Sequence, residues 1–153
     1  MMLNDKLVAA YTAILREELL LATGCTEPIA VAYCAAKLRE VLGGKPEEVL
    51  AEVSGNILKN VKSVVVPNTD GRRGIDAAIA VGIVAGDADA ELQVIANVTE
   101  DDAAAIQGYL DTTPIKVTCP ETPCLLDIFL HGKRAGHTAA VRGRAAQETR
   151  ARV

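Results

Sequence analysis

The chain has 153 residues, a net charge of −4, a mean hydropathy of +0.20 and 50% hydrophobic residues, which fits one globular domain. No basic stripe marks a nucleic-acid partner, and no uncharged apolar run reaches the about 18 residues of a membrane span. The charged residues before position 21 exclude the apolar core of a signal peptide, so we expect a cytoplasmic protein.

Two helices are expected at the N-terminus. Apolar residues recur at helical spacing over residues 4–21 and again over residues 27–42. Thr26 is placed to cap the second helix, Pro28 is tolerated in its first turn, and the glycine pair at 43–44 ends it.

The middle of the chain alternates short strands and helices. In chain order the patterns predict a strand over 49–53, a turn or helix start at 54–56, a strand over 63–66, a polar loop over 68–74, and helices over 75–85, 91–96 and 99–110. Small residues make up the helix at 75–85, and acidic residues open the last helix.

The last third of the chain is rich in strand patterns. Residues 115–118 alternate as a strand does, and residues 125–130 and 134–141 indicate a β-hairpin that turns at Gly132-Lys133. Helices first and strands later indicate an α+β fold, with two N-terminal helices, a small mixed sheet, further short helices and the C-terminal hairpin. We expect one domain over residues 1–142 and a tail over 143–153.

The turn at residues 23–28 is the first candidate for chemistry. Cys25 lies just before the expected second helix, where the helix dipole and the free first-turn N–H groups favour an anion and lower the pKa of a thiol. Gly24 allows a backbone conformation that other residues resist. A reactive or metal-binding thiolate and an ordinary capped turn are both open on these residues alone.

Two further polar segments are candidates for ligand binding. The Gly-rich loop at 67–74 precedes a helix, where it could receive a carboxylate or phosphate, but it has no nucleotide-binding motif and a solvent loop is the simpler interpretation. Asn56, Lys59 and Asn60 place amide and ammonium groups on a short expected helix. They could hold an amino-acid substrate, or they could face water.

The other cysteines and the histidines give weaker indications. In a cytoplasmic protein the four cysteines are expected as thiols, ligands or catalysts rather than disulfides. Cys119 and Cys124 are spaced as in a zinc knuckle but lack a second ligand pair, and Cys34 falls on an apolar stripe and is expected in the core. His131 and His137 have no serine or aspartate motif that would complete a hydrolase triad.

Four segments together resemble the L-cysteine desulfidase family, a branch of the serine dehydratase α-chain-like proteins. The first is Gly-Cys-Thr-Glu-Pro-Ile at 24–29, and the second is Val-Ser-Gly-Asn-Ile-Leu-Lys-Asn at 53–60. The third is Val-Val-Val-Pro-Asn-Thr at 64–69, and the fourth is the small-residue helix with its continuation at 74–94. Their order and approximate spacing agree with the family over about residues 10–130.

The resemblance implies a lyase that converts L-cysteine into sulfide, ammonia and pyruvate. Members of the family use a [4Fe–4S] cluster held by three cysteines, which leaves one iron open to the leaving group of the substrate. Cys25 matches the N-terminal cluster cysteine. The substrate-binding residues that we expect in the matching segments are Thr26, Glu27, Asn56, Lys59, Asn60, Asn68 and Thr69.

Members of the family are longer than this chain and carry their other cluster cysteines in a largely helical C-terminal domain. We expect that domain to be absent here, so that the chain alone binds no cluster and acts only with the missing domain or a partner chain. A homo-oligomer is also open. Three hypotheses follow, in this order: a segment of a lyase, a non-catalytic amino-acid-binding module, and a stand-alone thiol enzyme with Cys25 as its nucleophile.

Overall fold

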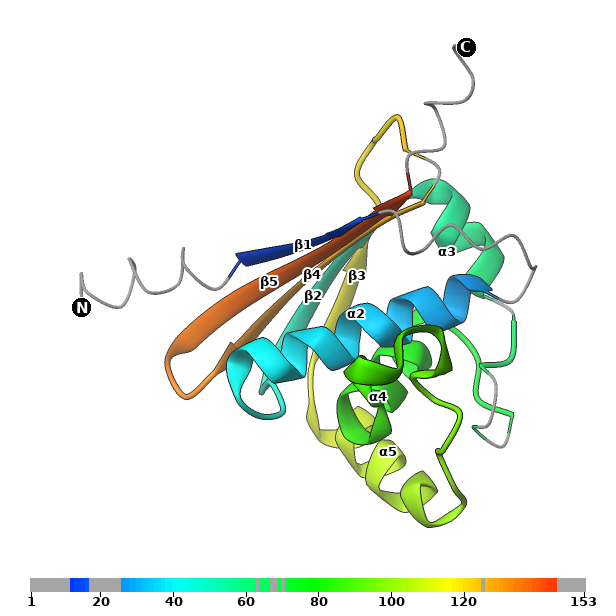
Figure 1. Ribbon diagram of the computed structural model, residues 1–153, viewed down its shortest axis with the longest axis vertical. Coiled ribbons are helices and arrows are strands. Elements are labelled where there is room, and N and C mark those ends of the chain that lie inside the picture. Colours follow the sequence, from blue (N-terminus) through cyan, green and yellow to red (C-terminus); the bar gives the residue numbers. More distant parts are fainter. Residues whose placement is uncertain are drawn as a thin grey trace.

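Helices lie against one face of a mixed β-sheet in the computed structural model of the chain (Figure 1). The structure describes residues 12–16, 26–62, 64–66, 69, 71–124 and 126–145. The helices are α2 (Thr26–Leu42), α3 (Gly55–Lys62), α4 (Ile75–Ala85) and α5 (Asp101–Thr112), with a short 3-10 helix at Ala88–Gln93. The strands are β1 (Thr12–Arg16), β2 (Glu48–Val53), β3 (Ile115–Thr118), β4 (Leu126–Arg134) and β5 (His137–Ala145). The α+β class expected from the sequence is confirmed.

The sheet has five strands in the order β1-β5-β4-β2-β3. β4 is antiparallel to both of its neighbours, whereas β1 runs parallel to β5 and β3 runs parallel to β2. Leu130 in the middle of β4 pairs with Ala51 on one side and Val141 on the other. All three side chains are fully buried, so this row marks the centre of the sheet face that the helices cover.

Small residues allow the helices and the sheet to approach closely. A side chain at Gly82 in α4 would collide with the backbone of Ala32 in α2. A side chain at Gly132 in β4 would come within 2.9 Å of Leu38 in α2. The scarcity of aromatic residues fits this close packing, because the small side chains of alanine and valine, together with glycine, fill the narrow space between helices and sheet.

Two expectations for the first half of the chain need correction. Residues 12–16, expected as part of the helix over 4–21, form strand β1, because pairing with the edge of β5 overrides a helical apolar pattern. The other residues of that range lie outside the described part of the chain. Of the strand expected over 63–66, the described residues 64–66 make only an isolated bridge between Val65 and Arg73 and do not join the sheet.

Three further expectations shift at their boundaries. The helix expected over 91–96 is a 3-10 helix that ends at Gln93. The hairpin is confirmed, but it turns at Ala135-Gly136, where both residues have positive φ, so that β4 continues through Gly132 and Lys133. β5 runs to Ala145, beyond the expected start of the tail at 143.

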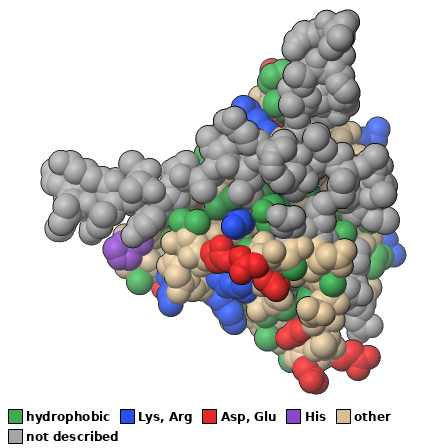
Figure 2. Space-filling view, viewed as in Figure 1, with side chains coloured by type: hydrophobic (Ala, Val, Ile, Leu, Met, Phe, Trp, Pro, Cys, Tyr) green, Lys and Arg blue, Asp and Glu red, His purple; other side chains and the backbone are tan. Residues whose placement is uncertain are grey.

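Acidic side chains gather at the end of the molecule that α5 forms (Figure 2). Asp101 and Asp102 lie in the first turn of that helix, where the helix dipole favours negative charge, as the acidic pattern at 99–102 predicted. Within the described part of the chain, no helix combines the length and apolar character that crossing a bilayer requires.

Candidate functional site

The start of α2 and the exposed side of α3 bring three of the expected site residues together. Glu27 lies in the first turn of α2, and Asn56 and Asn60 lie one helical turn apart on α3. The side-chain amide of Asn60 donates to the Glu27 carboxylate at 3.3 Å and to the Asn56 side-chain carbonyl at 3.4 Å. Residues from the first and second family-like segments therefore form one hydrogen-bonded cluster, which we call the Glu27 cluster.

The local sequence explains why α3 presents its amides to α2. β2 ends at Val53, and the buried Ser54 accepts a 3.4 Å hydrogen bond from the Ile57 backbone N–H, which starts the helix at once. Ile57 and Val61 are fully buried. Because these two side chains fix one face of α3 in the core, the asparagines at 56 and 60 lie on another face, at intermediate exposure.

The Glu27 cluster has the groups that an amino acid requires. The Glu27 carboxylate, beside the start of α2, can accept hydrogen bonds from an ammonium group. Both hydrogens of the Asn60 amide are used within the cluster, which fixes the orientation of that side chain. Among the described residues, the amide N–H groups of Asn56 and the side-chain carbonyl of Asn60 are left for a ligand.

The other expected binding residues do not take part in the hydrogen bonds of the Glu27 cluster among the described residues. Lys59 lies on α3 with its side chain exposed. Thr69 is 4% exposed, and its hydroxyl donates to the Val66 carbonyl at 2.6 Å and accepts from the Arg72 backbone N–H at 3.2 Å, so it holds the loop together. Thr26 is the first residue of α2, but its side chain lies outside the described part of the chain, as do Cys25 and Asn68.

The described cysteines do not form a cluster site. Cys34 is fully buried in α2, and burial together with the charge of Asp127 raises the pKa of its thiol to about 12. This thiol is a core residue, as expected. Cys119 is exposed and Cys124 half-buried in the loop before β4. No group of three or more His, Cys, Asp or Glu side chains among the described residues is arranged to hold a metal ion.

The sheet carries a second polar constellation on the face turned away from the helices. We call this face the outer face; it consists of the even-numbered residues of β2 and β5 and the odd-numbered residues of β4. His131 Nε2 lies 3.0 Å from the Glu52 carboxylate. The centres of the Phe129 and His131 rings lie 4.2 Å apart. The guanidinium carbon of Arg142 lies over the Phe129 ring, 4.6 Å from its centre.

Asp127 lies at one end of the outer face and is 4% exposed. Arg142 donates two hydrogen bonds of 3.0 Å to its carboxylate, and Arg144 and Thr122 donate others at 3.2 and 3.1 Å. Burial alone would raise the pKa of this carboxyl, but the hydrogen bonds and charge of Arg142, with those of its other partners, hold the pKa below its usual value.

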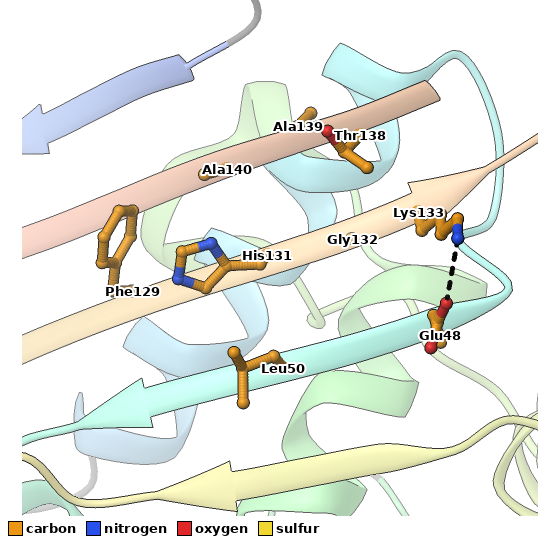
Figure 3. Close-up of a pocket in the computed structure, with 9 residues that line it drawn as sticks. All are labelled: Glu48, Leu50, Phe129, His131, Gly132, Lys133, Thr138, Ala139 and Ala140. Carbon is orange, nitrogen blue, oxygen red and sulfur yellow. Dashed lines mark ion pairs between the residues drawn. The ribbon is translucent and has the colours of Figure 1, made fainter. Parts of the chain in front are cut away.

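A hollow of about 480 Å³ lies in the outer face (Figure 3). Its lining includes Leu50, Phe129, His131 and Ala140, and also the ion pair of Glu48 with Lys133. Sequence patterns indicate this face only weakly, because His131 lacks a triad motif and the arginines lie near the end of the chain. The useful signal was the alternation of polar residues along β4, which places them all on one side of the strand.

The chain is similar to bacterial proteins named UPF0597 protein. It is 54% identical over 127 residues to UPF0597 protein DSY1109 of Desulfitobacterium hafniense, covering 83% of this chain and 30% of the relative. It is 50% identical over 128 residues to a UPF0597 protein of Treponema denticola, covering 84% of this chain and 30% of the relative. It is 51% identical over 118 residues to one from Finegoldia magna, covering 77% of this chain and 28% of the relative.

The chain therefore spans about 30% of the length of these relatives. Their names state no activity, and none mentions cysteine desulfidase or serine dehydratase. No protein-family model matches the chain. No solved structure matches it either.

Proposed function

We propose that this chain is the substrate-binding N-terminal part of an amino-acid lyase that resembles L-cysteine desulfidase. The observation that carries the proposal is the hydrogen bond of 3.3 Å between Asn60 and Glu27. This hydrogen bond joins two segments that resemble the same family and lie more than 20 residues apart in sequence. Glu27 follows Cys25 by two positions in the sequence. Two independent resemblances that meet in space support one shared site.

The residues of the Glu27 cluster have binding roles in this proposal. The Glu27 carboxylate binds the ammonium group of the substrate, and the amide N–H groups of Asn56, which have no acceptor among the described residues, donate to the substrate carboxylate. Asn60 holds both partners in position through its two hydrogen bonds. Lys59, exposed on the same helix, adds positive charge that favours an anionic ligand.

The proposed net reaction converts L-cysteine and water into sulfide, ammonia and pyruvate. The Cα–H and Cβ–S bonds break, the resulting enamine becomes an imine, and water hydrolyses the imine, so no oxidant or reductant is needed. A cluster in the complete enzyme would take Cys25 from this chain and further ligands from the part of the relatives that the chain does not span.

A second candidate function is a non-catalytic amino-acid-binding module. The observation that favours it is that the Glu27 cluster forms from this chain alone, without any group outside the described residues. Such a module would bind L-cysteine or L-serine through the same side chains and release it unchanged.

The complete Desulfitobacterium relative offers the sharpest test between these two functions. It would be purified without oxygen, loaded with iron and sulfide, and incubated with L-cysteine and, separately, with L-serine. A lyase yields sulfide and pyruvate in equal amounts from L-cysteine. Binding of either amino acid without turnover, while a known cluster enzyme loaded in parallel is active, would rule out the lyase and favour the binding module.

A further inference from the structure

We propose that the outer face of the sheet is a docking surface for the remaining part of the longer relatives' polypeptide. The occupant would be a protein layer that places an apolar side chain in the hollow of about 480 Å³ at the centre of this face. Three features of the structure support the proposal: the unequal burial of the two sheet faces, the pairing of charges on the outer face, and the length of the relatives.

The two faces of the sheet differ in cover. On the inner face Ala51, Leu130 and Val141 are fully buried, because α2 lies across β4 and β5. On the outer face Leu50 and Phe129 are only half-buried, and the helices lie behind the strands when this face is viewed from the front (Figure 3). The apolar side chains of this second face are surface that a further protein layer can bury.

The charges of the outer face are paired with one another. Glu48 lies 3.8 Å from Lys133, and Glu52 lies 3.0 Å from His131. Asp127 lies 3.0 Å from Arg142 and 3.2 Å from Arg144. A small charged ligand would have to break these pairs. A protein layer would not, and buried interface centres combine aromatic and arginine side chains with few unpaired charges, as Phe129 and Arg142 do here.

The relatives supply the occupant. The chain matches about 30% of the length of the Desulfitobacterium and Treponema proteins, so most of their polypeptide lies outside the region that this chain resembles. A domain held to such a remainder needs an interface, and stable interfaces bury about 800 Å² on each partner. The outer face offers three adjacent strands, a hollow and neutralised charges on one continuous surface.

This inference shares with the proposed function only the premise of a larger assembly. It does not depend on lyase activity, and it is tested by measuring whether the chain binds the remaining part of the relative. The Glu27 cluster lies at the junction of α2 and α3, away from the outer-face residues at the centre of the hollow. Failure of the docking surface would therefore leave the amino-acid site untouched, and failure of the amino-acid site would leave the docking surface untouched.

The test co-expresses the tagged 153-residue chain with the part of the Desulfitobacterium relative that lies beyond the matched region. Ala140→Arg places a long charged side chain in the centre of the outer face, where Ala140 is 8% exposed and turned away from the core. Leu50→Gln is the milder second variant, because it keeps the side-chain size and removes only the apolar surface. Ala104→Arg, at an exposed position of α5, is the matched control.

We expect the unaltered chain and Ala104→Arg to recover the relative's segment in equal molar amounts. Ala140→Arg should lower recovery by about tenfold or more, and Leu50→Gln should lower it less, because a charge in a desolvated interface centre costs more than a lost apolar contact. Circular dichroism would verify that each variant is folded. Equal recovery by folded Ala140→Arg, or no recovery by the unaltered chain, would overturn the proposal. So would a dimer of the chain alone that Ala140→Arg dissociates, because the occupant would then be a second copy.

Discussion

The side-chain amide of Asn60 in α3 donates a 3.3 Å hydrogen bond to the carboxylate of Glu27 at the start of α2. This contact links the side chains of the two helices at their polar ends. Because it joins residues of the two family-like segments, the interaction between these segments can be tested by mutating Glu27 and Asn60.

The interaction between Glu27 and Asn60 can be measured as a coupling free energy of unfolding. Glu27→Ala and Asn60→Ala each remove this hydrogen bond, and a hydrogen bond to a charged group contributes about 1.5–3 kcal/mol when buried and less at a half-exposed site such as this one. We expect a double-mutant cycle in urea to give a coupling of about 0.5–1.5 kcal/mol. Lys59→Ala on the same helix should change stability by less than about 0.5 kcal/mol. A coupling of zero would mean that the contact is not formed in solution.

Gly82 sets the spacing of α2 and α4. Gly82→Ala should destabilise the chain by about 1–3 kcal/mol, because the added methyl group collides with the Ala32 backbone and the two helices must move apart. Gly108→Ala is the matched control in α5, where an added methyl group meets no atom within 4 Å. There the same substitution should stabilise the helix by about 0.5–1 kcal/mol. Urea unfolding of both variants measures this contrast, and equal effects would show that the helix spacing is wrong.

Asp127 should give the fold an acid-sensitive contribution. Its pKa in the folded chain lies below the value of about 3.8 for a free side chain, so the ionised carboxylate stabilises the fold above that value. This stabilisation is lost as the pH falls through the lowered folded-state pKa.

Asp127→Asn should therefore cost about 1.5–3 kcal/mol at neutral pH and reduce the fall in stability from about pH 5 downward. Urea midpoints measured across that range test the expectation. Asp89→Asn, at an exposed position, should keep the wild-type pH dependence. An unchanged slope in Asp127→Asn would show that other acids control the acid response.

The described cysteines should differ sharply in reactivity. Cys119 is exposed, whereas Cys34 is fully buried with a pKa raised to about 12, and only a thiolate is alkylated readily. Mild iodoacetamide treatment followed by mass spectrometry should find Cys119 modified in the folded chain and Cys34 modified only after unfolding. Early modification of Cys34 would place α2 differently from the structure.

Local sequence patterns predicted those elements whose structure is decided by neighbours in the chain. The helix after Thr26 and the small-residue helix at 75–85 follow from periodic apolar residues and glycine boundaries, and both are confirmed. β1 was missed because its five residues become a strand only by pairing with β5, from the other end of the chain. The hairpin turn was misplaced because Gly132 is required by the approach of Leu38, a contact that the local sequence does not reveal.

The candidate site was predicted in the same partial way. Glu27 was chosen from one segment and Asn56 and Asn60 from another, and the structure brings the three side chains together. The outer face was not predicted, because its residues come from three strands and become neighbours only through the register of the sheet. Asp127, for example, lies opposite Arg144. Pairing of charges across strands is set by the sheet and not by spacing along the chain.

Binding of an amino acid by the Glu27 cluster can be measured by titrating the isotope-labelled 153-residue chain with L-cysteine and recording nuclear magnetic resonance spectra. We expect shifts of the backbone amides of residues 27, 56 and 60 at millimolar ligand, and about tenfold weaker binding by Asn60→Ala than by the control Asp89→Asn. No shifts at millimolar L-cysteine or L-serine, or equal binding by Asn60→Ala, would contradict it.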